Sequence, residues 1–133
     1  MKTIAAASAL TLMLSTAALA EGVEKPTETF GVSVDASAGF PLAEQVPVAD
    51  GYALRLRRVV LEPGAVIAHH SHVSRPSFAY VISGELVEHR DDGVIKTYGP
   101  GEFFAEGASL AHWAENKQKA EQTVLIGVDV VPE

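Results

Sequence analysis

Five histidines lie between residues 69 and 112, and three of them belong to the run His69-His70-Ser71-His72. On a β-strand, residues two apart point to the same face, so His70 and His72 would project side by side and His69 the other way. Two imidazoles on one face are the start of a site for a divalent metal ion, and His112 is the obvious third donor from a neighbouring strand. An H-x-H pair alone is a weak signal, and the alternative is a solvated polar strand face.

The segments that would position these histidines have the pattern of short β-strands. The chain after residue 20 contains 16 valines and only 7 leucines, and no segment keeps apolar residues at helical spacing for three turns. Asp50-Gly51, Ser83-Gly84 and Asp92-Gly93 are typical of tight turns between strands, and Glu62-Pro63-Gly64 is a further turn signal. Recurring turns between short strands predict an all-β sandwich or barrel. The expected strands are residues 30–34, 52–57, 59–61, 78–82, 86–88, 94–98, 110–114 and 123–131.

Alternation within two of these strands predicts what each face carries. Residues 52–57 place Leu54 and Leu56 on one face and Arg55 and Arg57 on the other, and Arg58 breaks the pattern, which suggests a bulge. Arg55, Arg57 and Arg75 could contact an anionic ligand, although exposure to solvent is the default expectation for charges on strands.

The strand over residues 78–82 predicts an association surface. Phe78, Tyr80 and Ile82 alternate with the smaller Ser77 and Ala79. If Ser77 faces the interior, the three large side chains face outward, and a second subunit would cover them. We therefore expect a homodimer.

The spacing of glycines and histidines resembles the two motifs of the cupin superfamily, G-x5-H-x-H-x3,4-E-x6-G and G-x5-P-x-G-x2-H-x3-N. The resemblance covers about residues 52–131. The matching residues are Gly64, His70, His72 and Gly84 in the first motif, and Gly101, His112 and Asn116 in the second.

The resemblance implies a single cupin-type double-stranded β-barrel (jelly roll) over residues 41–133, preceded by an N-terminal arm over residues 21–40. It also implies one divalent metal ion, which could be zinc, copper, nickel, iron or manganese, on His70, His72 and His112. The family's glutamate falls on Ser77. We therefore expect Ser77 and Ala79 to border the cavity, and the absent carboxylate to leave a position at the metal open to water or an anionic ligand.

The other candidate residues have simpler interpretations. His69 is expected on the surface, and His89 is expected to be solvated at a hairpin end. Trp113 points away from His112 and is expected to pack in the core. Asn116 is expected to order the turn that follows its strand.

Residues 1–20 have the pattern of a secretory signal peptide, with Lys2 before an apolar run and a small-x-small cleavage signal at Ala18-Leu19-Ala20. We therefore expect a periplasmic or secreted protein with no membrane anchor after cleavage. Loading of the metal outside the cytoplasm would favour zinc, copper or nickel over iron.

The charge and the cysteine content of the sequence exclude some classes of binding partner and metal ligand. Lys2 is the one charge in the first 20 residues, so 9 of the 10 basic residues remain against 17 acidic ones, which disfavours nucleic-acid binding. The chain contains no cysteine, which excludes thiolate ligands and disulfides.

Three classes of function stay open. The first is a metal-dependent enzyme of oxygenase, isomerase or lyase type that acts on a small polar or anionic molecule. The second is a non-catalytic periplasmic protein that binds a metal or small ligand, and the third is a barrel kept for assembly. Nothing in the sequence names a substrate or a catalytic residue, because a fold and a metal site do not determine the chemistry.

Overall fold

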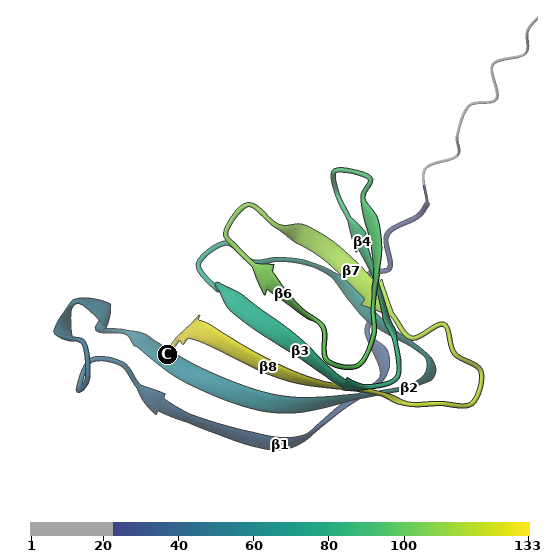
Figure 1. Ribbon diagram of the computed structural model, residues 1–133. Coiled ribbons are helices and arrows are strands. Elements are labelled where there is room, and N and C mark those ends of the chain that lie inside the picture. The colour runs from purple at the N-terminus through teal and green to yellow at the C-terminus, as the bar shows by residue number, and fades with distance from the viewer. Residues whose placement is uncertain (1–22) are drawn as a thin grey trace, which may run out of the picture.

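The computed structural model describes residues 23–133, so the predicted signal peptide lies outside the described residues. The described chain consists of β-strands and one short 3-10 helix, η1 (Figure 1). Their bounds are β1 (Phe30–Pro41), η1 (Pro47–Ala49), β2 (Tyr52–Ser71), β3 (Ser77–Ser83), β4 (Leu86–Arg90), β5 (Ile95–Tyr98), β6 (Phe103–Glu106), β7 (Ala111–Glu115) and β8 (Thr123–Pro132).

The long strand β2 belongs to both layers of the fold. The sheet has the strand order β5-β4-β7-β2-β8-β3-β6, and β1 pairs with β2. The first half of β2 pairs with β8, and the second half pairs with β7. The sheet therefore folds over along β2, so that β4 and β7 lie across from β3 and β8 (Figure 1). This nearly closed antiparallel barrel confirms the all-β prediction.

The bend in β2 replaces one of the predicted turns. Residues 62–64 were expected to end a strand, but the backbone continues through them as part of β2. Gly64 has a φ of 77°, a conformation that strongly favours glycine, and its N–H donates to the carbonyl of Asn116 at 2.9 Å. The Asn116 side chain is fully buried and donates to the carbonyls of Leu61, Glu62 and Glu121. Asn116 thus ties the loop before β8 to the bend.

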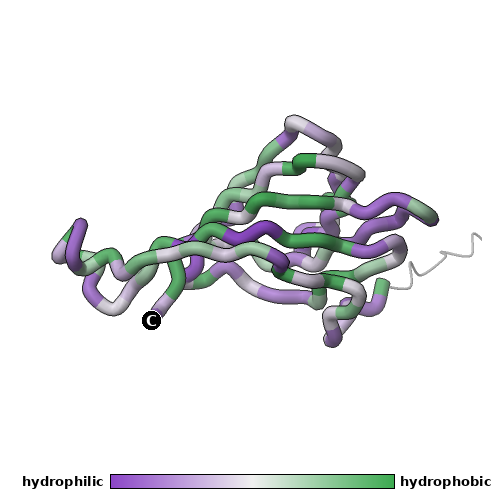
Figure 2. The backbone as a smooth tube through the Cα atoms, turned by 90° about the horizontal axis from the view of Figure 1, so that it is seen from below, coloured by the Kyte–Doolittle hydropathy of each residue, from purple (hydrophilic) through white to green (hydrophobic). Residues whose placement is uncertain are grey.

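Apolar side chains fill the space between the layers. Tyr98 and Phe104 stack with ring centroids 4.4 Å apart. The largest buried members of this core are Leu61, Val81, Leu86, Tyr98, Phe104 and Leu125. Figure 2 shows hydrophobic segments of adjacent strands side by side, while hydrophilic residues occur in the loops and also within a central strand. Within residues 23–133, no helix has the length and apolar character needed to cross a membrane.

Three elements differ from the sequence prediction. β1 extends beyond residues 30–34 as far as Pro41, and β6 was not predicted. The bulge lies in β1, where Asp35 is the extra residue opposite Val59 and Arg58, whereas β2 keeps a continuous register with β8. Arg58 did not break the strand's alternation, because it continues the outward face of β2 and pairs there with Asp35. The predicted strands 52–57 and 59–61 form one strand, β2, which continues to Ser71. The predictions for β3, β4, β5, β7 and β8 match within two residues at each end.

Candidate metal centre

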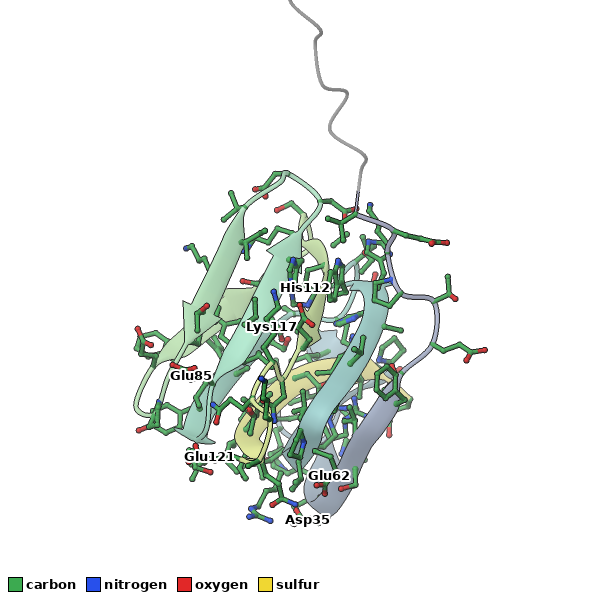
Figure 3. All side chains as sticks on the ribbon, turned by 90° about the vertical axis from the view of Figure 1, so that its right-hand side faces the viewer. Asp35, Glu62, Glu85, His112, Lys117 and Glu121 are labelled. Carbon is green, nitrogen blue, oxygen red and sulfur yellow. The ribbon has the colours of Figure 1, made fainter. Side chains whose placement is uncertain are left out.

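Three histidines converge inside the barrel. His70 and His72 project from the same face of β2, and the pairing of β2 with β7 places His112 directly opposite His70. The Nε2 atoms are 3.1 Å apart for His70 and His72, 3.0 Å for His72 and His112, and 3.1 Å for His112 and His70. Figure 3 shows His112 among the strands, with Glu62, Glu85 and Glu121 towards the other end of the barrel.

The opposite nitrogen of each ring determines which tautomer is present. The Nδ1 atom lies 2.8 Å from the carbonyl of Ala68 in His70, 3.1 Å from the carbonyl of Arg75 in His72, and 2.7 Å from Glu88 Oε1 in His112. All three partners accept hydrogen bonds, so each neutral ring carries its proton on Nδ1. Each Nε2 atom therefore presents a lone pair to the other two.

Burial favours the neutral form of two of these rings. It lowers the pKa of His70 to about 4, and it also lowers the pKa of His72. Nitrogens separated by 3.0–3.1 Å can all lie about 2.0–2.1 Å from one ion, the usual distance for zinc and imidazole. The three-histidine group therefore has the tautomers and the spacing to hold a divalent metal ion.

Glu88 accepts a hydrogen bond from Nδ1 of His112, on the side of the ring away from the cluster. The sequence analysis did not identify this residue. The carboxylate is fully buried and accepts hydrogen bonds from His112 Nδ1, Arg90 Nε and Tyr98 OH at 2.7, 2.9 and 3.0 Å. Burial raises the pKa of Glu88, but the three hydrogen bonds outweigh it and the net pKa is lowered, so the group is ionised at neutral pH. The sequence feature that could have identified Glu88 is its spacing of two residues from Leu86, which places both side chains on the inward face of β4.

Glu106 brings a carboxylate to the front of the cluster. Its Oε1 lies 3.5 Å from His72 Nε2 and 3.4 Å from His112 Nε2, and its other oxygen accepts a hydrogen bond from the Ser77 hydroxyl. The structure therefore places a carboxylate beside two of the histidines, which the sequence analysis did not predict. Because β6 was not predicted, the inward alternation of Phe104 and Glu106 went unnoticed.

A cavity of about 360 Å³ opens beside the cluster and is lined by the three histidines and Glu106. Ala79 lines it as predicted. Ser77 is buried as expected, but its hydroxyl contacts Glu106 and His72 Nδ1. Most of the remaining wall is apolar and includes Val32, Val34, Val59, Ile67, Phe104 and Leu125.

Arg55 and Arg57 of β2 face inward, contrary to the default expectation of solvent exposure. Arg55 Nε and Nη2 donate to the two oxygens of Asp129 at 3.0 and 2.7 Å, and Arg57 Nη2 donates to Asp129 Oδ2 at 3.0 Å. The Asp129 side chain is 1% exposed. Arg57 and Arg75 both line the cavity. The alternation was predicted correctly, but the polar face of β2 is the interior one.

The remaining predicted residues lie outside the cluster. His69 Nε2 pairs with Asp91 at 2.9 Å, and its side chain is partly exposed. His89 is not simply solvated, because its ring stacks on Trp113 with centroids 3.7 Å apart and its Nε2 lies 2.7 Å from Glu115. Trp113 is half-buried in this stack, so it packs against His89 and not in the core.

The comparison with protein families agrees with this geometry. The profile described as Cupin domain matches residues 57–129, more than half of the chain. The protein belongs to the cupin family. No curated protein matches this cupin.

Solved structures share its fold. An RmlC-like cupin from Shewanella frigidimarina has a TM-score of 0.59 and 22% identity over 87% of this chain and 89% of its own. An uncharacterized protein with a double-stranded β-helix domain from Klebsiella pneumoniae has a TM-score of 0.53 and 26% identity over 59% of this chain and 63% of its own. Drosophila melanogaster CENP-C, solved bound to CAL1, has a TM-score of 0.52 and 14% identity over 59% of this chain and 71% of its own. The cupin thus spans less than two thirds of the Klebsiella chain.

The ion pairs of Asp129 predict a pH dependence of stability. Burial raises the pKa of Asp129, but the hydrogen bond from Arg55 and the charges of Arg57 and Arg55 lower it below its ordinary value. A depressed pKa stabilises the fold above the unfolded-state value of about 3.9, and this stabilisation is lost as the pH falls through the folded-state value. We expect Asp129→Asn to lower the free energy of unfolding at pH 7 by about 2 kcal/mol, because both guanidinium groups lose a buried partner but stay partly solvated.

The measurement is urea denaturation of metal-free protein between pH 3 and pH 7. The variant should lose less stability than the wild type on acidification. Asp50→Asn, at an exposed carboxylate, is the matched control and should follow the wild type. Parallel pH curves for the wild type and Asp129→Asn would contradict the assignment.

Proposed function

We propose that this cupin is an exported, metal-dependent enzyme of oxygenase, isomerase or lyase type that acts on a small polar or anionic molecule. The observation that carries the proposal is the convergence of three unprotonated Nε2 atoms beside a cavity of about 360 Å³. His70, His72 and His112 would hold the ion. A bound divalent ion would supply Lewis-acid chemistry, or oxygen activation if it were iron. The pattern of residues 1–20 supports export.

The surrounding side chains would orient the centre. Glu88 accepts the Nδ1 proton of His112, which keeps the Nε2 lone pair directed at the ion. The Ser77 hydroxyl donates to one oxygen of Glu106 and leaves the other close to the histidines. We assign Glu106 as a fourth donor, which would reduce the net charge of a bound divalent ion from +2 to +1.

A non-catalytic protein that binds a metal or small ligand is the alternative. The described residues could bind an ion without turning over a substrate, and the CENP-C structure shows that the fold also occurs in a protein complex. Catalytic turnover of a substrate would distinguish an enzyme from a non-catalytic binding protein.

Metal content tests the centre directly. Protein purified without a metal-affinity tag should contain about one equivalent of divalent metal by elemental analysis. His70→Ala combined with His72→Ala should contain none, because His112 and Glu106 would supply only two of the donors that a stable site needs. His69→Ala combined with His89→Ala is the matched control and should keep the metal, since neither ring belongs to the cluster.

A wild-type protein that takes up no zinc, cobalt, nickel, copper, iron or manganese would overturn the proposal. Once metal is bound, proton NMR of a mixture of small organic acids and sugars distinguishes enzyme from binding protein. Loss of more than one equivalent of any compound per protein would establish catalysis, whereas saturable binding without loss would favour the alternative.

Replacement of Glu106 tests the fourth donor. Glu106→Gln keeps the size of the side chain but removes its charge. We expect the affinity for zinc, measured by competition with a chromophoric chelator, to fall by about 10- to 100-fold. Glu85→Gln, at an exposed carboxylate, should leave it unchanged. Equal affinities for Glu106→Gln and the wild type would show that Glu106 is not a ligand.

We also propose that a second copy of the chain covers the outer face of β3. Phe78, Tyr80 and Ile82 are 60%, 44% and 49% exposed, and Phe103, paired with Tyr80 in the sheet, is 68% exposed. At the other edge of the same layer, all but one residue of β1 is exposed. An isologous dimer would cover this face with no further partner.

Light scattering tests the dimer. We expect the wild type to have the mass of a dimer, and Phe78→Asp combined with Tyr80→Asp to have that of a monomer, because the charges would be buried without partners. Ile95→Asp is the control, since Ile95 is equally exposed but lies on β5 in the other layer. A wild-type monomer at high concentration would contradict this proposal.

A further inference from the structure

Besides the histidine cluster, a group of arginines lies near the cavity, on the side formed by β2 and β8. Three guanidinium groups, those of Arg55, Arg57 and Arg75, gather around the single carboxylate of Asp129. Arg55 uses both oxygens of that carboxylate, and Arg57 shares one of them. Positive charge is therefore in excess on this part of the wall.

Arg57 is the group with unused hydrogen-bonding capacity. Its Nε is buried and lacks a partner, the one such side-chain atom among residues 23–133. A buried N–H without an acceptor is costly, so it marks a place where an acceptor is missing. Burial lowers the pKa of Arg57, and the nearby charges of Arg55 and Arg75 lower it further, against the opposing effects of Asp129 and Glu106.

Arg75 supplies a second cation on the same wall. It lines the cavity, and its side chain forms no ion pair with any carboxylate in the described part of the chain. Glu106, a carboxylate that lines the cavity, already accepts a hydrogen bond from Ser77 and lies beside His72 and His112. Within residues 23–133, Arg75 therefore has no carboxylate as a direct ion-pair partner, and its charge is only partly balanced by Asp129.

We propose that Arg57 and Arg75 form an anion-binding subsite for the carboxylate of a small organic acid. This proposal rests on the proposed function and names the substrate class of the same cavity. The planar fork of a guanidinium matches the two oxygens of a carboxylate. The cavity lining also includes apolar side chains such as Val59 and Leu125, which can contact a hydrocarbon body. The ligand would carry a carboxylate at one end and an oxygen donor for the metal at the other.

The test uses succinate and butyrate, which have the same four-carbon chain but carry two carboxylates and one. Binding to the cobalt-loaded protein is followed by the cobalt absorption spectrum, and binding to the metal-free protein by NMR. In the cobalt-loaded wild type, we expect succinate to bind at least about tenfold more tightly than butyrate, since it alone can engage both ends.

Arg75→Gln and Arg57→Gln should each remove most of this difference and should weaken succinate binding to the metal-free protein. Arg75 forms no ion pair within residues 23–133, so Arg75→Gln is the variant of choice if Arg57→Gln proves unstable. Arg58→Gln is the matched control, because Arg58 follows Arg57 in sequence but pairs with Asp35 on the opposite face of β2. It should bind both acids as the wild type does.

The outcomes separate the two proposals. Unchanged succinate binding by both variants, in the presence of bound cobalt, would overturn the anion subsite and leave the metal centre intact. Failure of the wild type to bind cobalt, with arginine-dependent succinate binding in the metal-free protein, would overturn the metal centre and support the subsite. Tighter binding of 3-phosphonopropionate than of succinate, by tenfold or more, would overturn the assignment to a carboxylate.

Discussion

Three imidazole lone pairs that face one another at 3.0–3.1 Å impose the constraint on which the rest of the barrel depends. Without a cation between them, these lone pairs repel one another, so the backbone must hold the rings in place. Alternation along β2 sets His70 and His72 on one face, and the register with β7 sets His112 opposite. The acceptors that orient the rings come from β2 itself, from the loop after it and from β4. The length of β2 and the pairing of β4 with β7 therefore both determine the positions of the three Nε2 atoms.

The oriented cluster is connected to the hydrophobic core through Glu88. A buried carboxylate is unfavourable unless its oxygens are satisfied, and here His112, Arg90 and Tyr98 all donate to it. Tyr98 in turn stacks on Phe104, whose side chain forms part of the cavity wall. Packing of the core thus restricts the ring that faces the cavity, which is the kind of support that a site of fixed geometry requires.

The sequence predicted well those features that depend on local spacing. The histidine cluster follows from i, i+2 alternation and motif spacing, and the inward positions of Ser77 and Ala79 follow from the outward row of Phe78, Tyr80 and Ile82. Glu88 and Asp129 were missed because a charged residue on a strand usually faces solvent, and Glu106 was missed because its strand, β6, was not predicted. Their burial depends on partners distant in sequence, such as His112 for Glu88 and Arg55 for Asp129. Alternation shows which residues share a face, but which face is interior depends on the tertiary fold.

The relation between Ser77 and Glu106 shows how a site can keep its charge when a motif residue changes. Ser77 occupies the position where the family motif has a glutamate, and Glu106 lies directly opposite it in the pairing of β3 with β6. Side chains at directly opposed positions project to the same face of a sheet with Cβ atoms about 5 Å apart. A carboxylate on either strand can therefore reach the same point beside His72 and His112. A small residue at position 77 then becomes a requirement, because a second carboxylate there would place two like charges against each other in a buried space. The hydroxyl of Ser77 meets this requirement and also donates a hydrogen bond to Glu106, which holds the carboxylate towards the histidines.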